Sequence, residues 1–174
     1  MITIFRPMEE RDREPVIEMM RCFYRSDAVL TNGSDEIFNR DIDQCIARSP
    51  YLEGYILEND GTIQGYALLA KSFSAEFGRR CIWVEDLYIK SEYRGRGIGS
   101  CFLKFVEEKY PDSVFRLEVE RENEHAVHVY QKKGYRVLPY MEMIKQDEMF
   151  EMTDGNGTCE CEGWIGTKEE AVFR

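Results

Sequence analysis

Residues 83–99 read WVEDLYIKSEYRGRGIG, and this stretch decides the fold class. Its first part, Trp83–Ile89, is rich in aromatic and β-branched side chains, which is typical of a buried strand. A short linker then leads to a glycine-rich turn, Arg94–Gly99. The apolar residues after the turn recur at helical spacing until about Pro111. The sequence therefore predicts a strand that runs through a glycine-rich turn into a helix.

The glycine-rich turn has the composition of an anion-binding site. Gly95, Gly97 and Gly99 lack side chains, so a ligand can approach the backbone closely. The unpaired amides at the helix start and the positive end of the helix dipole favour the same ligand. Arg94 and Arg96 add positive charge in an otherwise acidic protein, so the expected ligand is a phosphate or a pyrophosphate.

Two common phosphate-binding motifs are excluded at this turn. A nucleotide P-loop requires G-x-x-x-x-G-K-[ST], but no lysine follows Gly99. A dinucleotide fingerprint requires G-x-G-x-x-G, whereas the glycines here run G-x-G-x-G. Taken alone, the stretch is also compatible with a purely structural turn between a strand and a helix.

The hydrophobic pattern around this stretch predicts an α+β, or mixed α/β, layout with one sheet. A β-prone run at 2–6 is followed by two expected helices, one at 14–24 and one from Asp35 to Pro50. Two β-rich runs then flank Asp60-Gly61, a strong hairpin signal. We expect strands at 51–57, 62–72, 81–89, 114–119 and 135–144, and further helices at 98–111 and 123–133.

The composition of the chain limits the classes of protein to which it can belong. The chain has 174 residues, 43% of them hydrophobic, which suits one globular domain rather than a disordered chain. A net charge of −10 argues against nucleic acid as a partner and permits a cationic one. No apolar run is long enough for a membrane helix, and Met1–Arg6 does not begin a signal peptide. We therefore expect no membrane partner.

The cysteines and histidines suggest neither disulfides nor a metal site. Four of the six cysteines fall singly inside apolar segments, which predicts buried thiols in a reducing cytoplasm. Cys159 and Cys161 form a C-x-C pair that is most simply explained as two core residues on one strand face. His125 and His128 lack a third ligand, so we expect surface residues and no metal.

A second informative segment spans residues 123–135, NEHAVHVYQKKGY. Asn123 is a good helix cap, and Gly134 can adopt the left-handed turn that ends a helix. Ala126 and Tyr130 are four residues apart and share a helix face. By itself the segment could be a capped amphipathic helix with Tyr130 in the core.

Together the two segments resemble the GNAT acyltransferase superfamily. The order Arg-x-x-Gly-x-Gly after Glu-Asp-Leu-Tyr-Ile is similar to its acyl-CoA loop, and its later pattern is matched by Asn123, Ala126, Tyr130, Gly134 and Tyr135. The resemblance covers about residues 51–144 and implies a single domain over 1–145. It also implies a mostly antiparallel sheet with about four flanking helices, in which the fourth strand splays from the fifth to admit acyl-CoA.

The resemblance implies roles for individual residues. Those assigned to acetyl-CoA are the strand backbone at Leu87, Tyr88 and Ile89, the turn at Arg94, Gly95, Arg96, Gly97, Ile98, Gly99 and Ser100, and Asn123 beside the pantetheine. Tyr130 is expected near the thioester sulfur. A phenol there can lend a proton to the leaving thiolate, so Tyr130 is the expected general acid.

The expected base is a carboxylate, because an amine is protonated at neutral pH and must lose a proton before it attacks. Glu85 and Asp86 are the candidates, and we expect both to bind the acceptor. Because they are adjacent, their side chains should face opposite sides of a regular strand. The Glu-Asp pair resembles that of spermidine/spermine acetyltransferases, and we favour Glu85. Both acids could instead be surface carboxylates, but the apolar strand argues against this.

The sequence therefore predicts a cytoplasmic, acetyl-CoA-dependent N-acetyltransferase acting on the primary amine of a small, cationic molecule. Two alternatives stay open: an acyl-CoA-binding module without turnover, and an acetyltransferase for protein N-termini or lysines. The presence of both Glu85 and Tyr130 favours an enzyme.

Residues 146–174 form an acidic C-terminal extension beyond the expected domain. Residues 149–161 contain a turn-rich Asp-Gly-Asn-Gly segment between two β-prone runs, which predicts a hairpin. Such a hairpin would cover the sheet edge or meet a second subunit in a homodimer. The alternative is a frayed acidic end.

Overall fold

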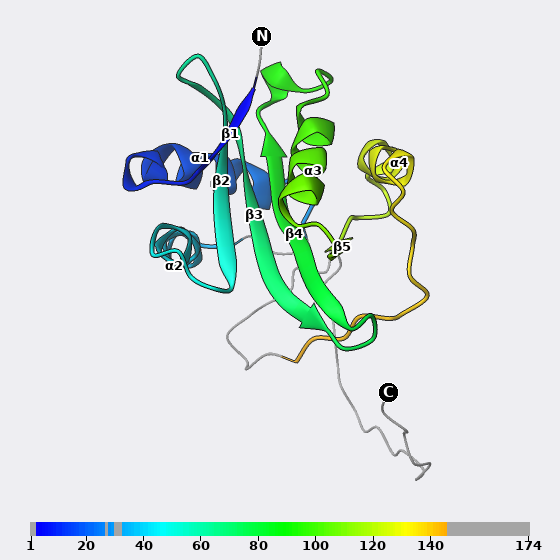
Figure 1. Cartoon of the computed structure of the whole chain (residues 1–174). Coiled ribbons are helices and arrows are strands. Elements are labelled where there is room, and N and C mark those ends of the chain that lie inside the picture. The colour runs from blue at the N-terminus through cyan, green and yellow to red at the C-terminus, as the bar shows by residue number, and fades with distance from the viewer. Residues whose placement is uncertain (1–2, 27, 30–32, 146–174) are drawn as a thin grey trace, which may run out of the picture.

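The computed structural model describes residues 3–26, 28–29 and 33–145 (Figure 1). The elements of these ranges are β1 (Ile4–Pro7), α1 (Arg13–Tyr24), α2 (Asp35–Ile46), β2 (Leu52–Asn59), β3 (Thr62–Ser74), β4 (Arg79–Ile89), α3 (Ile98–Lys109), β5 (Val114–Leu117) and α4 (Glu124–Lys132). Short 3-10 turns lie at Glu10–Asp12 and Ser91–Tyr93. The hairpin expected at 149–161 lies outside the described residues, as does the C-x-C pair. No helix of the described ranges is long and apolar enough to cross a membrane.

The five strands form one sheet in the order β1-β2-β3-β4-β5. The first three pairings are antiparallel, and only β4 and β5 run parallel. The prediction of a mixed, mostly antiparallel sheet with about four helices is confirmed. Each expected strand boundary in this sheet lies within a few residues of the observed one.

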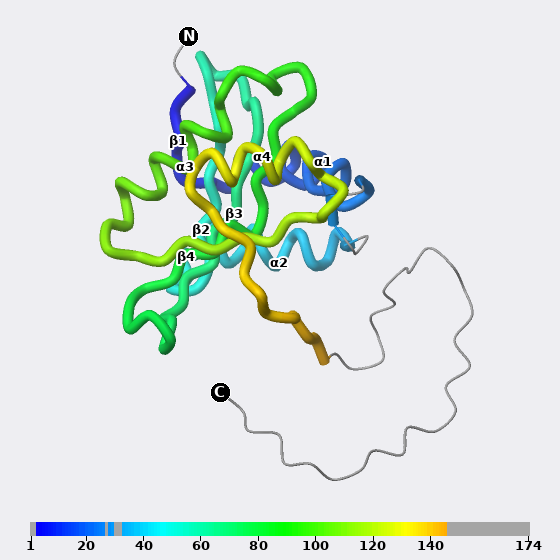
Figure 2. Tube along the Cα trace, turned by 90° about the vertical axis from the view of Figure 1, so that its right-hand side faces the viewer, coloured from blue at the N-terminus to red at the C-terminus, as the bar shows by residue number. Residues whose placement is uncertain are grey.

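Helices cover both faces of the sheet. Figure 2 shows α3 on one side and α1 and α2 on the other. The apolar stripe of α1 packs with α2 on one face of the sheet, in a core that contains Met20, Phe38, Ile42, Ile56 and Tyr66. The second core contains Leu57, Leu69, Ile82, Phe102 and Val106, and Tyr130 of α4 packs against it. Because helices cover both faces of the sheet, β4 lies in the middle of the molecule.

The strand expected at 135–144 is not formed. Residues 135–145 have irregular backbone, and Val137, Met141 and Met143 are exposed. Pro139 offers a physical reason, because it has no amide hydrogen to donate to a ladder and interrupts the β-prone run. Among the described residues β5 is therefore the last strand of the sheet.

The thiol prediction is correct only in part. Cys22, Cys45, Cys81 and Cys101 are all free, but Cys22 and Cys101 are exposed rather than buried. Both exposed thiols lie on helices, where one face meets solvent. The two histidines are exposed as expected, and the described residues contain no cluster of three or more metal-ligating side chains.

Candidate active site

The site begins where β4 and β5 separate. Their parallel pairing runs from Cys81 opposite Val114 to Val84 opposite Leu117, where β5 ends. β4 continues to Ile89 and stays paired with β3 on its other edge. Beyond Val84, the edge of β4 that faces β5 has no strand partner among the described residues (Figure 1). The backbone of Leu87, Tyr88 and Ile89 therefore offers an edge to which an extended ligand could hydrogen-bond.

A β-bulge lies at the point of separation. Leu68 of β3 pairs with Asp86, whereas Leu69 pairs with Val84, so Glu85 is the extra residue. Before the bulge Val84 belongs to the core under α3, and after it Leu87 packs against that same core. A bulge re-aims side chains in this way. The expectation of a regular strand at Glu85 and Asp86 is therefore wrong, and the extra residue is one of the two candidate bases.

The glycine-rich turn follows the free end of β4. Gly95 and Gly97 have φ of +73° and +78°, and a Cβ on either would have no atom of the described residues within 4 Å. Gly97 is the N-cap of α3, and no side chain caps the amides of its first turn. The space beside the turn is thus open to a ligand, and the helix amides have the geometry of an anion site.

The side chains of Arg94 and Arg96 donate hydrogen bonds to backbone carbonyls close to the turn. Arg94 Nε donates to the carbonyl of Ile89 at 2.8 Å, and an Arg96 Nη donates to the carbonyl of Glu92 at 2.8 Å. The guanidinium of Arg94 also lies 5.7 Å from the Tyr88 ring centroid. Each guanidinium has further N–H groups left to bind an anion. The structure brings the predicted turn residues together beside the open edge of β4.

Asp86 is buried on the face of the sheet that α1 and α2 cover, opposite to the face of Val84 and Leu87. Its carboxylate accepts hydrogen bonds from Tyr66 at 2.8 Å and Tyr24 at 3.3 Å. Burial raises the pKa of Asp86 to about 6, against the effect of both hydrogen bonds, and the charges of Asp41 and Glu85 add to the rise. Asp86 therefore holds two tyrosines in place and is well shielded from bulk water.

Asp41 of α2 is a candidate site residue that sequence reasoning missed. Burial and the charge of Glu85 raise its pKa to about 6. The signal was present, because Asp41 interrupts the apolar stripe Phe38, Ile42, Cys45 on the inner face of α2. A carboxylate in such an apolar stripe is uncommon, because Asp is rarely buried without a partner. Here it lies close enough to Glu85 and Asp86 to interact with both electrostatically.

Glu85 stands in a markedly negative environment. The side chain is exposed, yet the surrounding protein displaces part of its water and raises its pKa, and the charge of Glu142 adds to the rise. Glu118, which follows β5, shares a hydrogen bond with Glu142 that raises the pKa of Glu118 to about 7. An exposed carboxylate with a raised pKa is a better proton acceptor than an ordinary one.

Asn123 and Tyr130 lie at the two ends of α4. Asn123 Oδ1 accepts from the amide of Ala126 at 3.2 Å, so it caps the helix as expected and its side-chain NH₂ is left to donate. Tyr130 is half-buried, and its ring centroid lies 5.8 Å from that of Tyr135. Burial raises the pKa of Tyr130, and no hydrogen bond joins its hydroxyl to a described residue. The phenol therefore keeps its proton at neutral pH.

Comparison with known proteins identifies a matching family. The model of the Acetyltransferase (GNAT) family matches residues 14–135. Thialysine N-epsilon-acetyltransferase of Sus scrofa is 46% identical over 77 residues, which cover 42% of this chain and 45% of that protein. The chain thus spans about half the length of the curated relatives it matches.

Solved structures share the fold at low identity. AAC(6')-Iy in complex with the bisubstrate analog CoA-S-monomethyl-acetylneamine matches with a TM-score of 0.67 at 14% identity, covering 84% of this chain and 99% of that one. A predicted acetyltransferase from Clostridium acetobutylicum, solved with acetyl-CoA, matches with a TM-score of 0.67 at 16% identity, covering 83% and 96%. These two matches show the fold alone. Because the family model spans well over half of the sequence, the chain belongs to the acetyltransferase (GNAT) family.

Proposed function

We propose that the chain is an acetyl-CoA-dependent N-acetyltransferase that acts on the primary amine of a small, cationic molecule. One observation carries the proposal: the free edge of β4 leads directly into an open, uncapped glycine-rich turn. We place the protein in the cytoplasm, a proposal supported by the four free thiols of the described ranges.

In this proposal acetyl-CoA lies along the free edge of β4. The backbone of Leu87–Ile89 pairs with the pantetheine, and the residues of Arg94–Ser100 hold the pyrophosphate. Asn123 donates its side-chain amide from the start of α4. The acetyl-CoA supplies an acyl group activated as a thioester. The positive φ angles of Gly95 and Gly97 and the empty space beside them fit a phosphate at the turn.

Glu85 is the proposed base and Tyr130 the proposed acid. Glu85 accepts a proton from the ammonium, directly or through water, which frees a nitrogen lone pair to attack the acetyl carbonyl carbon. Tyr130 donates its phenolic proton to sulfur as the C–S bond breaks, and the proton that the new amide nitrogen loses restores the phenol. Asp86 is the poorer candidate for the base, because it is buried and both its oxygens accept hydrogen bonds from tyrosines.

The proposed acceptor is cationic because the carboxylates around Glu85 create a negative potential. Asp41, Asp86, Glu118 and Glu142 all interact with it electrostatically. A relative of this chain is named for thialysine, and a neighbouring structure holds an analog built from an acetylated neamine. Both names describe molecules that carry amino groups, which supports an amine acceptor here.

The cofactor site is tested by Gly97→Ala. We expect acetyl-CoA to bind at least about tenfold more weakly, because the new methyl group occupies the space where the pyrophosphate approaches. Gly78→Ala is the matched control: Gly78 also has a positive φ, +61°, and open space around it, but lies in the turn between β3 and β4. Backbone strain is therefore similar in both variants. Calorimetric titration that finds unchanged affinity in folded Gly97→Ala would overturn the assignment of the turn.

The acceptor is tested with primary amines of matched size and different charge. We expect kcat/KM to be about tenfold or more higher for a cationic amine than for an anionic one, because a negative potential raises the local concentration of cations. The advantage should shrink as ionic strength rises, because salt screens the field. A best acceptor that is anionic, with kcat/KM insensitive to salt, would show that these carboxylates do not govern the acceptor site.

A further inference from the structure

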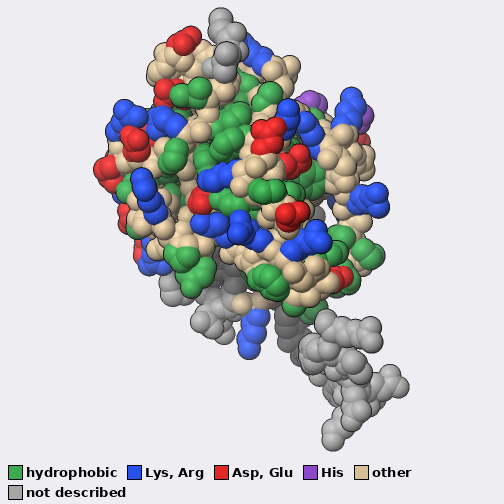
Figure 3. Space-filling view, viewed as in Figure 1, with side chains coloured by type: hydrophobic (Ala, Val, Ile, Leu, Met, Phe, Trp, Pro, Cys, Tyr) green, Lys and Arg blue, Asp and Glu red, His purple; other side chains and the backbone are tan. Residues whose placement is uncertain are grey.

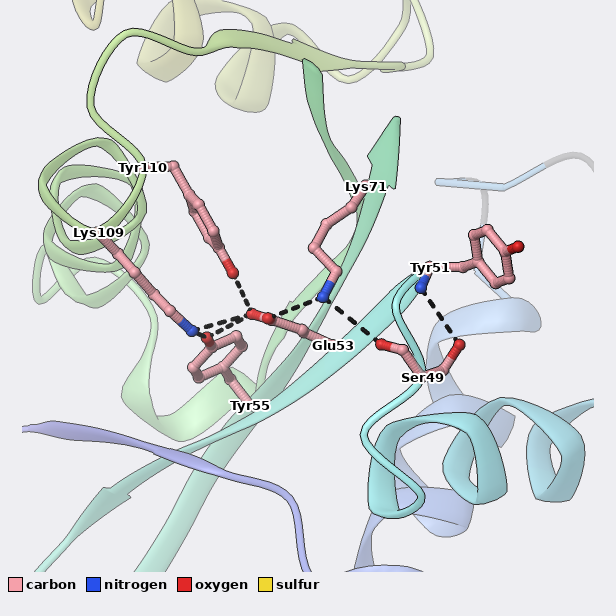
Figure 4. A network of polar contacts seen from close by, with 7 residues as sticks. All are labelled: Ser49, Tyr51, Glu53, Tyr55, Lys71, Lys109 and Tyr110. Carbon is pink, nitrogen blue, oxygen red and sulfur yellow. Dashed lines mark hydrogen bonds and ion pairs between the residues drawn. The ribbon is translucent and has the colours of Figure 1, made fainter. Parts of the chain in front are cut away.

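A polar network joins β2, β3 and the last residue of α3, near the end of β4 that is opposite to the glycine-rich turn. At its centre is Glu53 of β2, which forms ion pairs of 3.0 Å with both Lys71 of β3 and Lys109 of α3. Tyr55 and Tyr110 donate their hydroxyls to the same carboxylate. Figure 4 shows these side chains converging on Glu53 from three elements and from the residue after α3.

The network holds its two lysines in fixed positions. Burial alone would raise the pKa of Glu53, but the hydrogen bonds from Tyr110, Tyr55, Lys109 and Lys71 lower it to about 2. Glu53 is therefore ionised at every physiological pH. One carboxylate is shared by two ammonium groups, so the network carries a net positive charge.

Arg80 adds a second uncompensated charge. It lies near the start of β4, and its guanidinium carbon is 5.6 Å from the ring centroid of Tyr110. No carboxylate of the described ranges forms an ion pair with Arg80. Two surplus cations in one place are unexpected in a chain with a net charge of −10. Figure 3 shows lysine and arginine side chains gathering on this face of the molecule.

Beside these groups lies a cavity of about 380 Å³ that is open to solvent and is lined by Pro50, Glu53, Lys71, Ser72, Arg80 and Tyr110. The volume is within the range of small-molecule sites. It is separate from the proposed cofactor site, because β4 rises about 3.3 Å per residue and Arg80 is therefore roughly 30 Å from Ile89. Nothing in the proposed acetyl transfer uses this cavity.

We propose that this cavity binds a small anion of the phosphate class, either inorganic phosphate or a phosphorylated metabolite. The guanidinium of Arg80 suits two oxygens of one phosphate, and the ammonium of Lys71 supplies a further donor. Glu53 does not repel the ligand appreciably, because two lysines neutralise it. Two surplus positive charges match a dianion better than a single carboxylate.

The proposal is tested by titrating the full chain with inorganic phosphate at constant ionic strength and following backbone amide shifts by NMR. We expect saturable shifts at Ser72, Arg80 and Tyr110. The local readout distinguishes this site from phosphate at the glycine-rich turn, which would move Gly95 and Gly97 instead. Shifts confined to the turn, or shifts that do not saturate, would overturn the proposal.

Arg80→Gln is the decisive variant, and Arg79→Gln is its matched control. Arg79 is the preceding residue on β4, so it points to the other face of the sheet and its loss removes the same charge. We expect Arg80→Gln to weaken phosphate binding about tenfold or more and Arg79→Gln to leave it nearly unchanged. Equal losses in the two variants would mean general electrostatic attraction without a site. If the shifts saturate, a phosphorylated metabolite can be sought by competition.

Discussion

Replacement of Tyr130 by phenylalanine will slow acetyl transfer by about 10²–10⁴-fold while acetyl-CoA binds as before. The reason is that the variant loses only the proton donor for the leaving thiolate. Burial raises the pKa of Tyr130, so in the wild type the phenol is protonated wherever the enzyme works. The phenylalanine ring would still fill the half-buried position beside Tyr135, so the fold should tolerate the change.

Tyr135→Phe is the control for this prediction. Its ring lies beside that of Tyr130, and burial raises its pKa to about 12, so both phenols are neutral at pH 7. We expect Tyr135→Phe to keep most of the activity. If Tyr130→Phe instead keeps full turnover across the pH range, the phenol is structural and water must protonate the thiolate.

Replacement of Glu85 by glutamine is expected to lower kcat/KM by about 10²–10⁴-fold at neutral pH. Glutamine keeps the shape of the side chain but cannot accept the proton of the ammonium. The pH profile gives a sharper test. The pKa of Glu85 is raised, so wild-type activity should increase with pH as this group loses its proton. In Glu85→Gln this rising limb of the pH profile should vanish. Activity should then rise only at the higher pH at which the ammonium of the substrate loses its proton without a base.

Asp86→Asn decides between the two candidate bases. Burial raises the pKa of Asp86 to about 6, so a base at this position would also produce a limb in the pH profile. We expect Asp86→Asn to keep the limb that Glu85→Gln loses. The opposite result, with the limb lost only in Asp86→Asn, would assign the base to Asp86 and leave Glu85 as part of the acceptor-binding charge.

Much of the architecture follows from local sequence, because the relevant signals lie close together in the chain. The strand, turn and helix of residues 83–109 are encoded by a β-rich run, three glycines and a helical stripe. Asn123 predicts the start of α4, and it caps that helix in the structure. These features depend on neighbours a few residues apart, which is the range over which sequence patterns are informative.

The features that sequence reasoning did not predict depend on distant residues. The bulge at Glu85 is defined by its pairing with Leu68 and Leu69 of β3, which no local pattern records. The apolar strand predicts that Asp86 is buried, but its partners Tyr24 and Tyr66 are far away in the chain and no local pattern identifies them. Residues 135–144 have β-prone side chains but pair with no strand of the described sheet. Propensity alone does not supply a hydrogen-bonding partner.

Mass spectrometry of the products tests most directly whether the acetyl group passes to an amine nitrogen. The purified chain is incubated with acetyl-CoA and a cationic primary amine such as thialysine, and the acetylated amine and free CoA are quantified together. We predict one equivalent of N-acetylated amine for each CoA released, and a fall of about 10²–10⁴-fold in the rate at which both products form in Glu85→Gln at neutral pH. Acetyl-CoA that binds but yields no acetylated amine, with any amine of the cationic, neutral and anionic set, would contradict the account and indicate an acyl-CoA-binding module.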